Sequence, residues 1–492
     1  MLMSRLFVVL VVGAGAVALA HFGNLVFHYL LQGGYLNHTE AKIAELAWGF
    51  LRGEQLYRDI AAPDYVINMY GPLLYDVQAA VFALAGGSVF ASKLPAIGAT
   101  VGSVVLLTVY VVRRWGIWPG LLGTAMMAGL LLHNLPFAYW AQSDPLLLLL
   151  VTVALVLIGG RPPRLSAYLV LGVCGGLLVN LKVYTPVYLL PLIVELWLAE
   201  GEPRRLVRGL AVAGLIGLVV AVLPWLAPNA SLLDNLAGVK AVASPRGRLD
   251  YFRVVEKSLF YLLPVLLAAT SWLLVRRRPS LAEAMPFATF TVTVILVWVP
   301  ATMPGAGPSH LLPLAPLACA LLSQLAAKVE RPWLQPVAAV AAAVVMMTAL
   351  PQQKRHAGSL SNLLPKAAET EVAVFAARHK GESVGMGWGE YEHYSHTFVG
   401  PELVFAGSPV LPGAITFMEL KASRLPYPTG ALAGLSECKP RHWLIPKNDR
   451  PFIMVSYYPG GEIVNQTWRD TFLRNYDKSE SLEYFDVWSC QR

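Results

Sequence analysis

The chain has 492 residues, of which 56% are hydrophobic and only 14% are charged, and its mean hydropathy is +0.55. A soluble domain carries about a quarter charged residues, so this composition argues against a soluble enzyme, a nucleic-acid-binding protein and a disordered chain. The net charge of +8 does not point to nucleic acid either, because the basic residues stand in short clusters between apolar runs. That pattern is typical of a protein with several membrane spans.

The first apolar run follows Arg5 and extends from about residue 6 to residue 31. It is about twice as long as the apolar part of a signal peptide, and it is long enough to cross a bilayer core of about 30 Å. We therefore expect it to be retained as a signal anchor.

Further apolar runs bring the expected number of spans to about eleven. They lie near residues 93–112, 117–133, 144–160, 165–181, 183–199, 209–227, 257–275, 283–301, 310–328 and 333–350. The positive-inside rule then assigns the basic clusters between the runs to the cytoplasm. These are Arg5, Arg113, Arg114, Arg161, Arg164, Arg204, Arg205, Arg208, Arg276, Arg277, Arg278, Lys328 and Arg331.

The segment 71–89 is apolar enough to be taken for another span, although it carries Asp76 and Gln78. Counting it as a span would move Arg113 and every later basic cluster to the wrong side of the membrane. We therefore predict a helix that lies along the outer surface. The N-terminus is then cytoplasmic and the C-terminus extracytoplasmic.

Two polar regions remain on the outer side, a first loop over residues 32–92 and the tail after Leu350. The tail alternates short blocks such as 367–379, 383–388 and 442–445, which is typical of a small α/β domain. The expected fold is an α-helical polytopic membrane protein with a transmembrane domain over residues 1–350 and an extracytoplasmic α/β domain over residues 351–492.

The four cysteines agree with this division. Cys174 and Cys319 fall inside spans, where a thiol behaves as a small hydrophobic group. Cys438 and Cys490 fall in the tail, where they could form a disulfide if that side is oxidising. The sequence has no Cys-x-x-Cys spacing of the kind that binds metals.

Two carboxylates and three cations fall at the outer ends of the predicted spans. Glu40 opens a helix whose apolar positions keep the spacing of one face, and it is either part of a capping box with Asn37 or a carboxylate at the mouth of a groove between spans. Asp144 either caps the helix that Pro145 begins or presents its charge at the outer surface. The cations are Lys93, Lys182 and His310. Each alone could be solvated or snorkelling, but carboxylates and cations above a lipid-lined groove tend to be functional.

Several motifs in this order resemble the GT-C superfamily of polyprenyl-phosphate-sugar glycosyltransferases, which includes protein O-mannosyltransferases and the lipid A aminoarabinose transferase. They are Asn37-His38-Thr39-Glu40-Ala41, Gly53-Glu54-Gln55-Leu56-Tyr57-Arg58-Asp59, Tyr70-Gly71-Pro72-Leu73-Leu74-Tyr75, Ala91-Ser92-Lys93-Leu94-Pro95, Ser143-Asp144-Pro145-Leu146, Leu181-Lys182 and Pro308-Ser309-His310-Leu311-Leu312-Pro313. The chain departs from the family pattern at Thr39, where relatives have Asp, and at Lys93, where they often have Arg.

The resemblance implies an inverting transfer of a sugar from a polyprenyl-phosphate donor to a hydroxyl of a cell-envelope glycan, lipid or protein, outside a bacterial inner membrane. Such a transfer needs a base for the acceptor hydroxyl and cations for the leaving phosphate. We assign Glu40 as the base, and Asp144 as a group that orients the acceptor, holds a divalent ion or replaces Glu40 as the base. Lys93, Lys182 and His310 are assigned to the donor phosphate.

Further contacts to donor or acceptor are expected from Tyr70, Arg253 and Lys257. A basic loop contains Arg246, Arg248, Arg253 and Lys257. This loop either closes over the donor or is attracted to anionic lipid headgroups. No cofactor is required apart from the divalent ion mentioned for Asp144, and no nucleic-acid partner is expected.

The sequence is less consistent with two other interpretations. The glycine-rich segment 385–391 lacks the full dinucleotide-binding fingerprint, so it is expected to form an acceptor platform or a structural cap. A transporter or lipid flippase would share the span count, but it would carry charges or broken helices in mid-span. Here the charges gather in the outer loops, which favours the transferase.

Overall fold

A computed structural model describes residues 2–60, 62, 64–242, 251–275, 280–303, 306–327, 333–361, 363–456 and 461–491. The chain divides into two compact units. The first comprises residues 1–27, 96–223 and 249–358, and the second comprises residues 28–95, 224–248 and 359–492.

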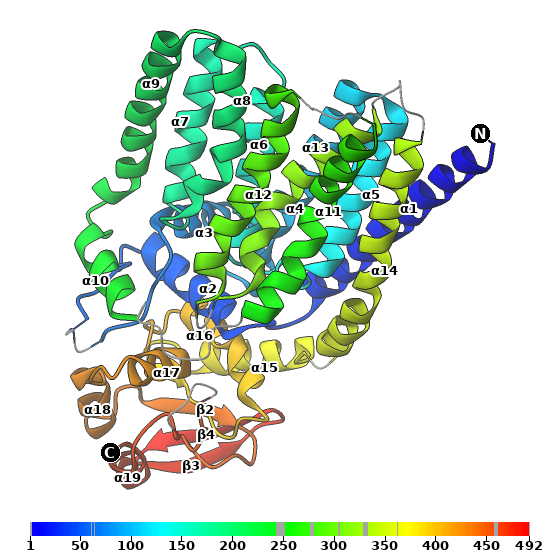
Figure 1. The fold of residues 1–492 in the computed structure, drawn as a ribbon. Coiled ribbons are helices and arrows are strands. Elements are labelled where there is room, and N and C mark those ends of the chain that lie inside the picture. Colours follow the sequence, from blue (N-terminus) through cyan, green and yellow to red (C-terminus); the bar gives the residue numbers. More distant parts are fainter. Residues whose placement is uncertain are drawn as a thin grey trace. The chain divides into compact units, whose positions relative to one another are not determined.

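The first unit is built from helices alone within its described residues (Figure 1). It contains most of α1 (Leu2–Leu31) and of α4 (Val89–Trp115). The remaining helices are α5 (Ile117–His133), α6 (Ser143–Ile158), α7 (Leu165–Val179), η1 (Thr185–Leu189), α8 (Leu190–Glu200), α9 (Pro203–Val222), α11 (Tyr251–Val275), α12 (Leu281–Ala301), η3 (Pro308–Leu314), α13 (Ala315–Ala326) and α14 (Leu334–Ser361).

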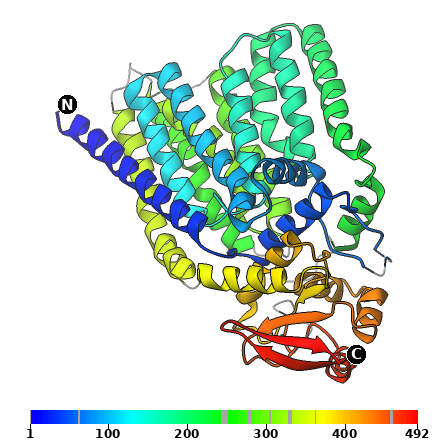
Figure 2. The same ribbon diagram turned by 180° about the vertical axis from the view of Figure 1, so that it is seen from behind.

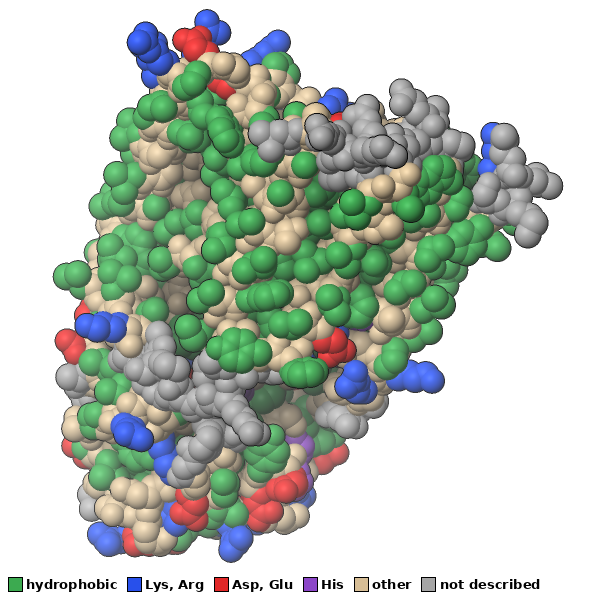
Figure 3. Space-filling view, in the orientation of Figure 1, with side chains coloured by type: hydrophobic (Ala, Val, Ile, Leu, Met, Phe, Trp, Pro, Cys, Tyr) green, Lys and Arg blue, Asp and Glu red, His purple; other side chains and the backbone are tan. Residues whose placement is uncertain are grey.

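Seven helices among the described residues are long and apolar enough to cross a membrane. They are Arg5–Leu31, Val89–Trp115, Pro203–Leu226, Tyr251–Ser271, Ala282–Ala301, Pro308–Ala326 and Leu334–Leu360. The class of an integral membrane protein built from helices is therefore confirmed, whereas the number of about eleven spans is not. The helices α5, α6 and α7 coincide with predicted spans but have only 17, 16 and 15 residues. In Figure 3, hydrophobic side chains dominate the visible surface of the helical first unit.

The helices α7 and α9 lie side by side because glycines let their backbones approach closely (Figure 1). A Cβ atom added at Gly172 would lie 2.5 Å from the carbonyl oxygen of Ala213, and one added at Gly176 would lie 2.6 Å from that of Gly217. Small residues at such contacts are the usual basis of helix packing within membranes. The contact therefore depends on the absence of a side chain at these positions.

The cysteines within the first unit behave as the sequence predicts. Cys174 on α7 and Cys319 on α13 are both buried and both free. Each therefore fills space in a helix contact as a small hydrophobic side chain.

The second unit begins with the helices of the first polar loop, α2 (His38–Leu51) and α3 (Pro72–Ala85). They pack on each other through the rings of Trp48 and Phe82, whose centroids are 5.7 Å apart. The 14 residues of α3 span about 21 Å at 1.5 Å per residue, which is shorter than a bilayer core. The length is compatible with the predicted surface helix, but α7 is only one residue longer, so the surface position stays a prediction. On α2, Ile43, Leu46 and Ala47 are buried as expected, whereas Leu51 is exposed.

The same unit contains α10 (Leu232–Val242) and the tail, which forms the predicted α/β domain. Its elements are α15 (Lys366–Arg378), β1 (Val384–Met386), η4 (Tyr394–Val399), α16 (Pro401–Phe405), α17 (Ala414–Ala422), α18 (Thr429–Ser436), β2 (His442–Pro446), α19 (Gln466–Asn475), β3 (Tyr476–Ser481) and β4 (Phe485–Cys490). The strand order is β1-β2-β4-β3. The first pair is parallel, and the other two pairs are antiparallel. Figure 2 shows β3 and β4, coloured red, side by side.

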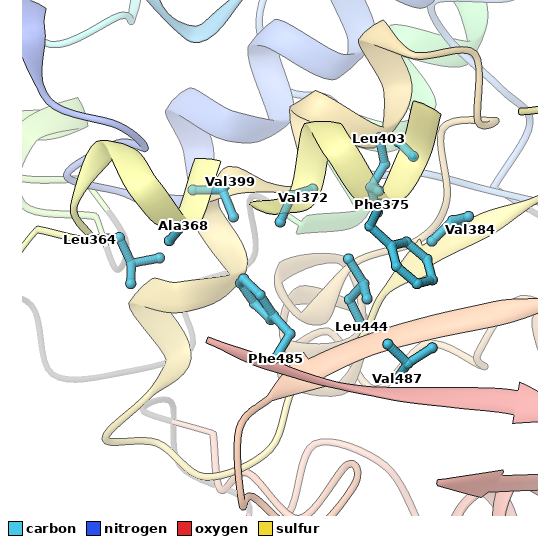
Figure 4. Close-up of a cluster of buried hydrophobic side chains, with 11 residues drawn as sticks. Leu364, Ala368, Val372, Phe375, Val384, Val399, Leu403, Leu444, Phe485 and Val487 are labelled. Carbon is cyan, nitrogen blue, oxygen red and sulfur yellow. The ribbon is translucent and has the colours of Figure 1, made fainter. Parts of the chain in front are cut away.

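The core of this domain lies between α15 and one face of the sheet (Figure 4). Ala368, Val372 and Phe375 recur on α15 at helical spacing and face Leu444 and Val487 of the strands. This periodic apolar face explains why the segment 367–379 forms a helix against a sheet.

A disulfide joins Cys438 and Cys490, as predicted. Their Cα atoms are 5.7 Å apart, which is within the usual range for a disulfide. The bond connects the turn before β2 to the end of β4, so it closes a loop that contains most of the sheet.

Candidate functional site

Glu40 lies in the first turn of α2 and is completely buried. One carboxylate oxygen accepts a hydrogen bond from the backbone N–H of Leu36 at 3.0 Å, and the other accepts one from the hydroxyl of Tyr29. Asn37 caps the helix, because its side-chain oxygen accepts a hydrogen bond from the N–H of Thr39 at 2.7 Å. Glu40 thus helps to fix the start of the helix, and its carboxylate is enclosed rather than open to the surface.

Lys93 belongs to the same cluster and is also completely buried. Its ammonium donates to the backbone carbonyls of Tyr29 at 2.8 Å and Gln32 at 2.9 Å, and it lies 4.2 Å from the centre of the Tyr29 ring. Lys93 also interacts electrostatically with Glu40. Tyr29 therefore connects the two predicted residues, with its hydroxyl on the carboxylate and its carbonyl on the ammonium.

Two carboxylates of the tail lie close to this cluster. Glu369 interacts electrostatically with Lys93, and it forms an ion pair with Lys366. Glu402 accepts a backbone hydrogen bond from Val89. Burial, together with the negative charge of Glu369, raises the pKa of Glu402 from 4.5 to about 7. We name the group of Glu40, Lys93, Glu369 and Glu402 the Glu40 cluster.

Asp144, Lys182 and His310 form a second group, in the first unit, which we name the Asp144 cluster. The ammonium of Lys182 donates to one carboxylate oxygen of Asp144 at 2.9 Å. The indole N–H of Trp140 donates to the other oxygen at 3.3 Å. Asp144 is buried, and 12% of the Lys182 side chain is exposed. A buried carboxylate needs such a counter-charge, and Lys182 supplies it.

His310 completes the Asp144 cluster, because both Asp144 and Lys182 interact with it electrostatically. Its Nδ1 lies 3.0 Å from the carbonyl oxygen of Gly307, and its ring lies 5.5 Å from that of Tyr184. The hydroxyl of Tyr188 donates to the backbone carbonyl of His310 at 2.7 Å. The imidazole is therefore held in place from several sides.

The interpretation of Asp144 as a helix cap is wrong. The helix α6 begins at Ser143 and its N-cap is Gln142, so Asp144 lies inside the first turn. Its carboxylate is used for Lys182 and Trp140 instead. A negative charge in the first turn still suits the helix dipole.

The other predicted residues are Tyr70, Arg253 and Lys257. The backbone carbonyl of Tyr70 accepts a hydrogen bond from the Tyr57 hydroxyl at 2.7 Å. On α11, Arg253 is exposed, whereas the ammonium of Lys257 donates to the carbonyl of His133 at 3.0 Å. Arg246 and Arg248 lie outside the described residues, as do the basic residues 276–278, 328 and 331 of the predicted cytoplasmic clusters.

A small cavity of about 60 Å³ within the second unit was not predicted. Its walls include Lys42 and Glu45 of α2, which form an ion pair, and Trp388 of the glycine-rich segment. The ammonium of Lys42 also donates to the carbonyl of Leu411 at 2.9 Å. His38 lines the same cavity, and burial lowers its pKa to about 4, so its imidazole is neutral at pH 7. The sequence signals for this site were the spacing of Lys42 and Glu45 on α2 and the glycine-rich segment 385–391.

An apolar groove of about 450 Å³ lies within the first unit. Its lining residues come from α7, α9 and the segment 186–193, and they include Gly175, Val179, Ile193, Leu210 and Leu218. The lining is apolar throughout, so the groove suits part of a hydrocarbon chain.

Comparisons with known proteins identify the fold. No protein-family profile matches the chain, and no curated protein sequence matches it significantly. Among solved structures, the crystal structure of ArnT from Cupriavidus metallidurans bound to undecaprenyl phosphate matches with a TM-score of 0.55 and 13% sequence identity. The match covers 98% of this chain and 97% of that chain.

Two further structures extend this comparison. ArnT from the same organism in the apo state matches with a TM-score of 0.54 at 13% identity, over 96% of this chain and 97% of that chain. Arabinosyltransferase EmbB from Mycobacterium smegmatis matches with a TM-score of 0.46 at 12% identity, over 92% of this chain and 45% of that chain. The match to ArnT over nearly the whole length of both chains confirms the GT-C fold that the motifs predicted.

Proposed function

We propose that the chain is a glycosyltransferase that moves a sugar from a polyprenyl-phosphate donor to a hydroxyl of a cell-envelope acceptor. The observation that carries this proposal is the shared fold with ArnT, a protein solved with undecaprenyl phosphate, over 98% of this chain. The apolar groove beside α7 and α9 supports it, because an isoprenoid tail needs such a lining. The transporter alternative is not favoured, because the matching structures are glycosyltransferases.

The chemistry of the two clusters fits this reaction. Transfer from a phosphate leaving group needs one carboxylate base and a positive environment for the departing phosphate, and it needs no strong general acid. Our proposal keeps Glu40 as the base and assigns Lys182, His310 and Lys93 to the phosphate. Asp144 then orients the acceptor or, as the alternative, serves as the base. In-line displacement at the anomeric carbon would invert its configuration.

The enclosed position of Glu40 specifies one further requirement. Its two oxygens accept hydrogen bonds from Tyr29 and Leu36, and the residue is completely buried, so the groups that cover Glu40 must move before an acceptor hydroxyl can reach it. Hydrogen bonds of a catalytic group often rearrange when the substrate binds. Of the two contacts, only the one from Tyr29 comes from a side chain.

The proposal also includes the membrane topology and the division of the chain. We place the N-terminus in the cytoplasm and the tail outside the inner membrane of a bacterium, with a transmembrane domain over residues 1–350 and an extracytoplasmic domain over residues 351–492. The acceptor would then be a glycan, lipid or protein of the envelope, and the transfer would occur on the side of the tail.

The test is transfer by the purified protein from polyprenyl-phosphate sugars to envelope extracts, without any ion gradient. Glu40→Gln keeps the size of the side chain but cannot take the proton, so turnover should fall roughly 100-fold or more while donor binding persists. Glu437→Gln, which changes an exposed carboxylate, is the matched control and should remain active. If the Glu40→Gln variant is active and the Asp144→Asn variant is inactive, Asp144 is the base. Full activity in both variants would refute the carboxylate mechanism at these positions.

A further inference from the structure

Three groups that could bind a metal meet in the tail, and none of them belongs to a residue assigned to sugar transfer. His379 is the C-cap of α15, Glu382 lies in the turn before β1, and His442 is the first residue of β2. The strands β1 and β2 are parallel, and Val384 pairs with His442. The end of the helix and the beginnings of the two strands therefore meet at one edge of the domain.

The potential ligand atoms converge closely. One oxygen of Glu382 lies 2.9 Å from Nδ1 of His379 and 2.6 Å from Nε2 of His442, and all three atoms lie within 4.8 Å of one another. A single carboxylate oxygen thus faces two imidazole nitrogens. An unprotonated imidazole nitrogen would repel the carboxylate oxygen at these distances. Either each nitrogen carries a proton that it donates to the oxygen, or one cation binds all three atoms in place of both protons.

We propose that His379, Glu382 and His442 bind one divalent transition-metal ion of the zinc type, and that the ion joins α15 to the beginnings of β1 and β2. Two imidazole nitrogens and one carboxylate are a common ligand set for zinc with an open fourth position. Magnesium and calcium are disfavoured, because they prefer oxygen ligands.

The surroundings of the three residues support a built site. The second ring nitrogen of His442 hydrogen-bonds the hydroxyl of Ser489 on β4 at 2.8 Å, a contact that fixes the orientation of the ring. The ring of His379 stacks on Phe375 with centroids 4.4 Å apart, and Phe375 also meets His442 edge to face. Both imidazoles are thus held by the core of the domain.

The exposure of the ligands agrees with an ion that exchanges with solvent. Exposed fractions of the side chains are 25% for His379, 47% for Glu382 and 11% for His442. Bonds of about 2.0–2.1 Å around one zinc ion place its ligand atoms about 3.3 Å apart. The Glu382 oxygen, now 2.9 and 2.6 Å from the two nitrogens, must therefore move outward by less than about 1 Å, which its exposed side chain permits. The two nitrogens, which lie within 4.8 Å of each other, must also adopt this spacing. A water molecule would fill the fourth position.

The test uses the full-length protein in detergent, first stripped with a chelator and then titrated with Zn²⁺ or Co²⁺. We expect one ion per chain, visible absorption from bound Co²⁺, and a Tm that rises with Zn²⁺ because the ion binds the folded state. Glu382→Gln and His379→Ala should each weaken Zn²⁺ binding at least 10-fold and abolish the rise in Tm. Ser489→Ala keeps all three ligands and should weaken binding less.

The matched control is His393→Ala, because His393 also hydrogen-bonds a carboxylate in the tail, that of Asp449 at 2.7 Å. This variant should bind Zn²⁺ as tightly as the wild type. Wild-type protein that binds no Zn²⁺ at millimolar concentration, or equal affinity in wild type and Glu382→Gln, would overturn the proposal. If a variant fails to fold, Zn²⁺ binding by the wild-type protein decides whether the site exists. None of these binding measurements depends on sugar transfer.

Discussion

The buried ammonium groups of Lys182 and Lys93 are stabilised in different ways. Lys182 is paired with the carboxylate of Asp144, whereas both hydrogen bonds of Lys93 go to backbone carbonyls at the end of α1 and just after it. Removing a lysine therefore leaves different groups without a partner. The consequences for function and for stability can be separated by experiment.

Lys182→Ala should raise the KM for the donor and lower kcat, because a cation that contacts the phosphate acts both on bound substrate and in the transition state. It also leaves Asp144 buried without its counter-charge, which should lower stability. The double variant Lys182→Ala with Asp144→Asn should recover the Tm but not the donor affinity. Lys439→Ala, which changes an exposed lysine, is the control. An unchanged KM in Lys182→Ala would show that Lys182 does not contact the donor phosphate.

Lys93→Ala should lower both donor affinity and stability. The loss of stability arises because the carbonyls of Tyr29 and Gln32 lose their donor, at about 1–3 kcal/mol for each unsatisfied group. Thermal unfolding and the donor KM, measured on the same preparation, check this prediction. A fall in Tm with an unchanged KM would leave Lys93 a purely structural role.

Glu402 should make the stability of the protein depend on pH. Its pKa is about 7 in the folded state, against an ordinary value of 4.5, so the folded protein retains a proton that the unfolded chain loses. The contribution of Glu402 to stability is therefore most favourable below about pH 4.5 and is lost as the pH rises to about 7. Glu402→Gln should raise the free energy of unfolding at pH 8 by up to about 3 kcal/mol and have little effect at pH 4.5. A Tm difference independent of pH would contradict this assignment.

At the level of the elements, the sequence predicted the helices better than the contacts between them. Apolar runs located the membrane helices, and the periodic residues of segment 367–379 located α15, because burial of one face determines both patterns. The Glu40 cluster was found only in part, since Tyr29 stands in an apolar run and Glu369 and Glu402 are more than 300 positions away from Glu40 in the chain. Contacts between residues so far apart in the chain produce no periodic pattern in the sequence. The cluster around His379 was missed for the same reason.

The contact between α7 and α9 provides a test at this scale. Gly172→Ala places a methyl group 2.5 Å from the carbonyl oxygen of Ala213, so the helices must separate, at about 1–3 kcal/mol. Gly214→Ala on α9 is a matched control, because nothing lies within 4 Å of its added Cβ atom. Thermal unfolding in detergent should show a lower Tm for Gly172→Ala alone. Equal Tm values would show that the contact is not as close as described.

At the scale of the whole molecule, the topology rests on the short helix α3. Its 14 residues are compatible with a surface position, and in the proposed topology this position puts the basic clusters in the cytoplasm. A span in its place would reverse the side of every later loop. The proposed site of transfer would then move to the opposite face of the membrane.

Reporter fusions test this topology directly. Alkaline phosphatase fused after Ser361, where α14 ends, should be active, and a fluorescent protein fused after Trp115, where α4 ends, should fluoresce. The opposite reporters at the same two positions are the controls. Phosphatase activity at Trp115 would show that α3 crosses the membrane.

The disulfide between Cys438 and Cys490 has a consequence for biogenesis. Its cysteines are 52 positions apart. At a synthesis rate of about 5–20 residues per second, Cys490 is therefore synthesised about 3–10 s after Cys438. In the proposed topology no other thiol of this chain reaches the oxidising side, since Cys174 and Cys319 are buried among helices of the membrane unit. Mispairing within the chain is thereby excluded, and an oxidase can complete the bond without the help of a disulfide isomerase.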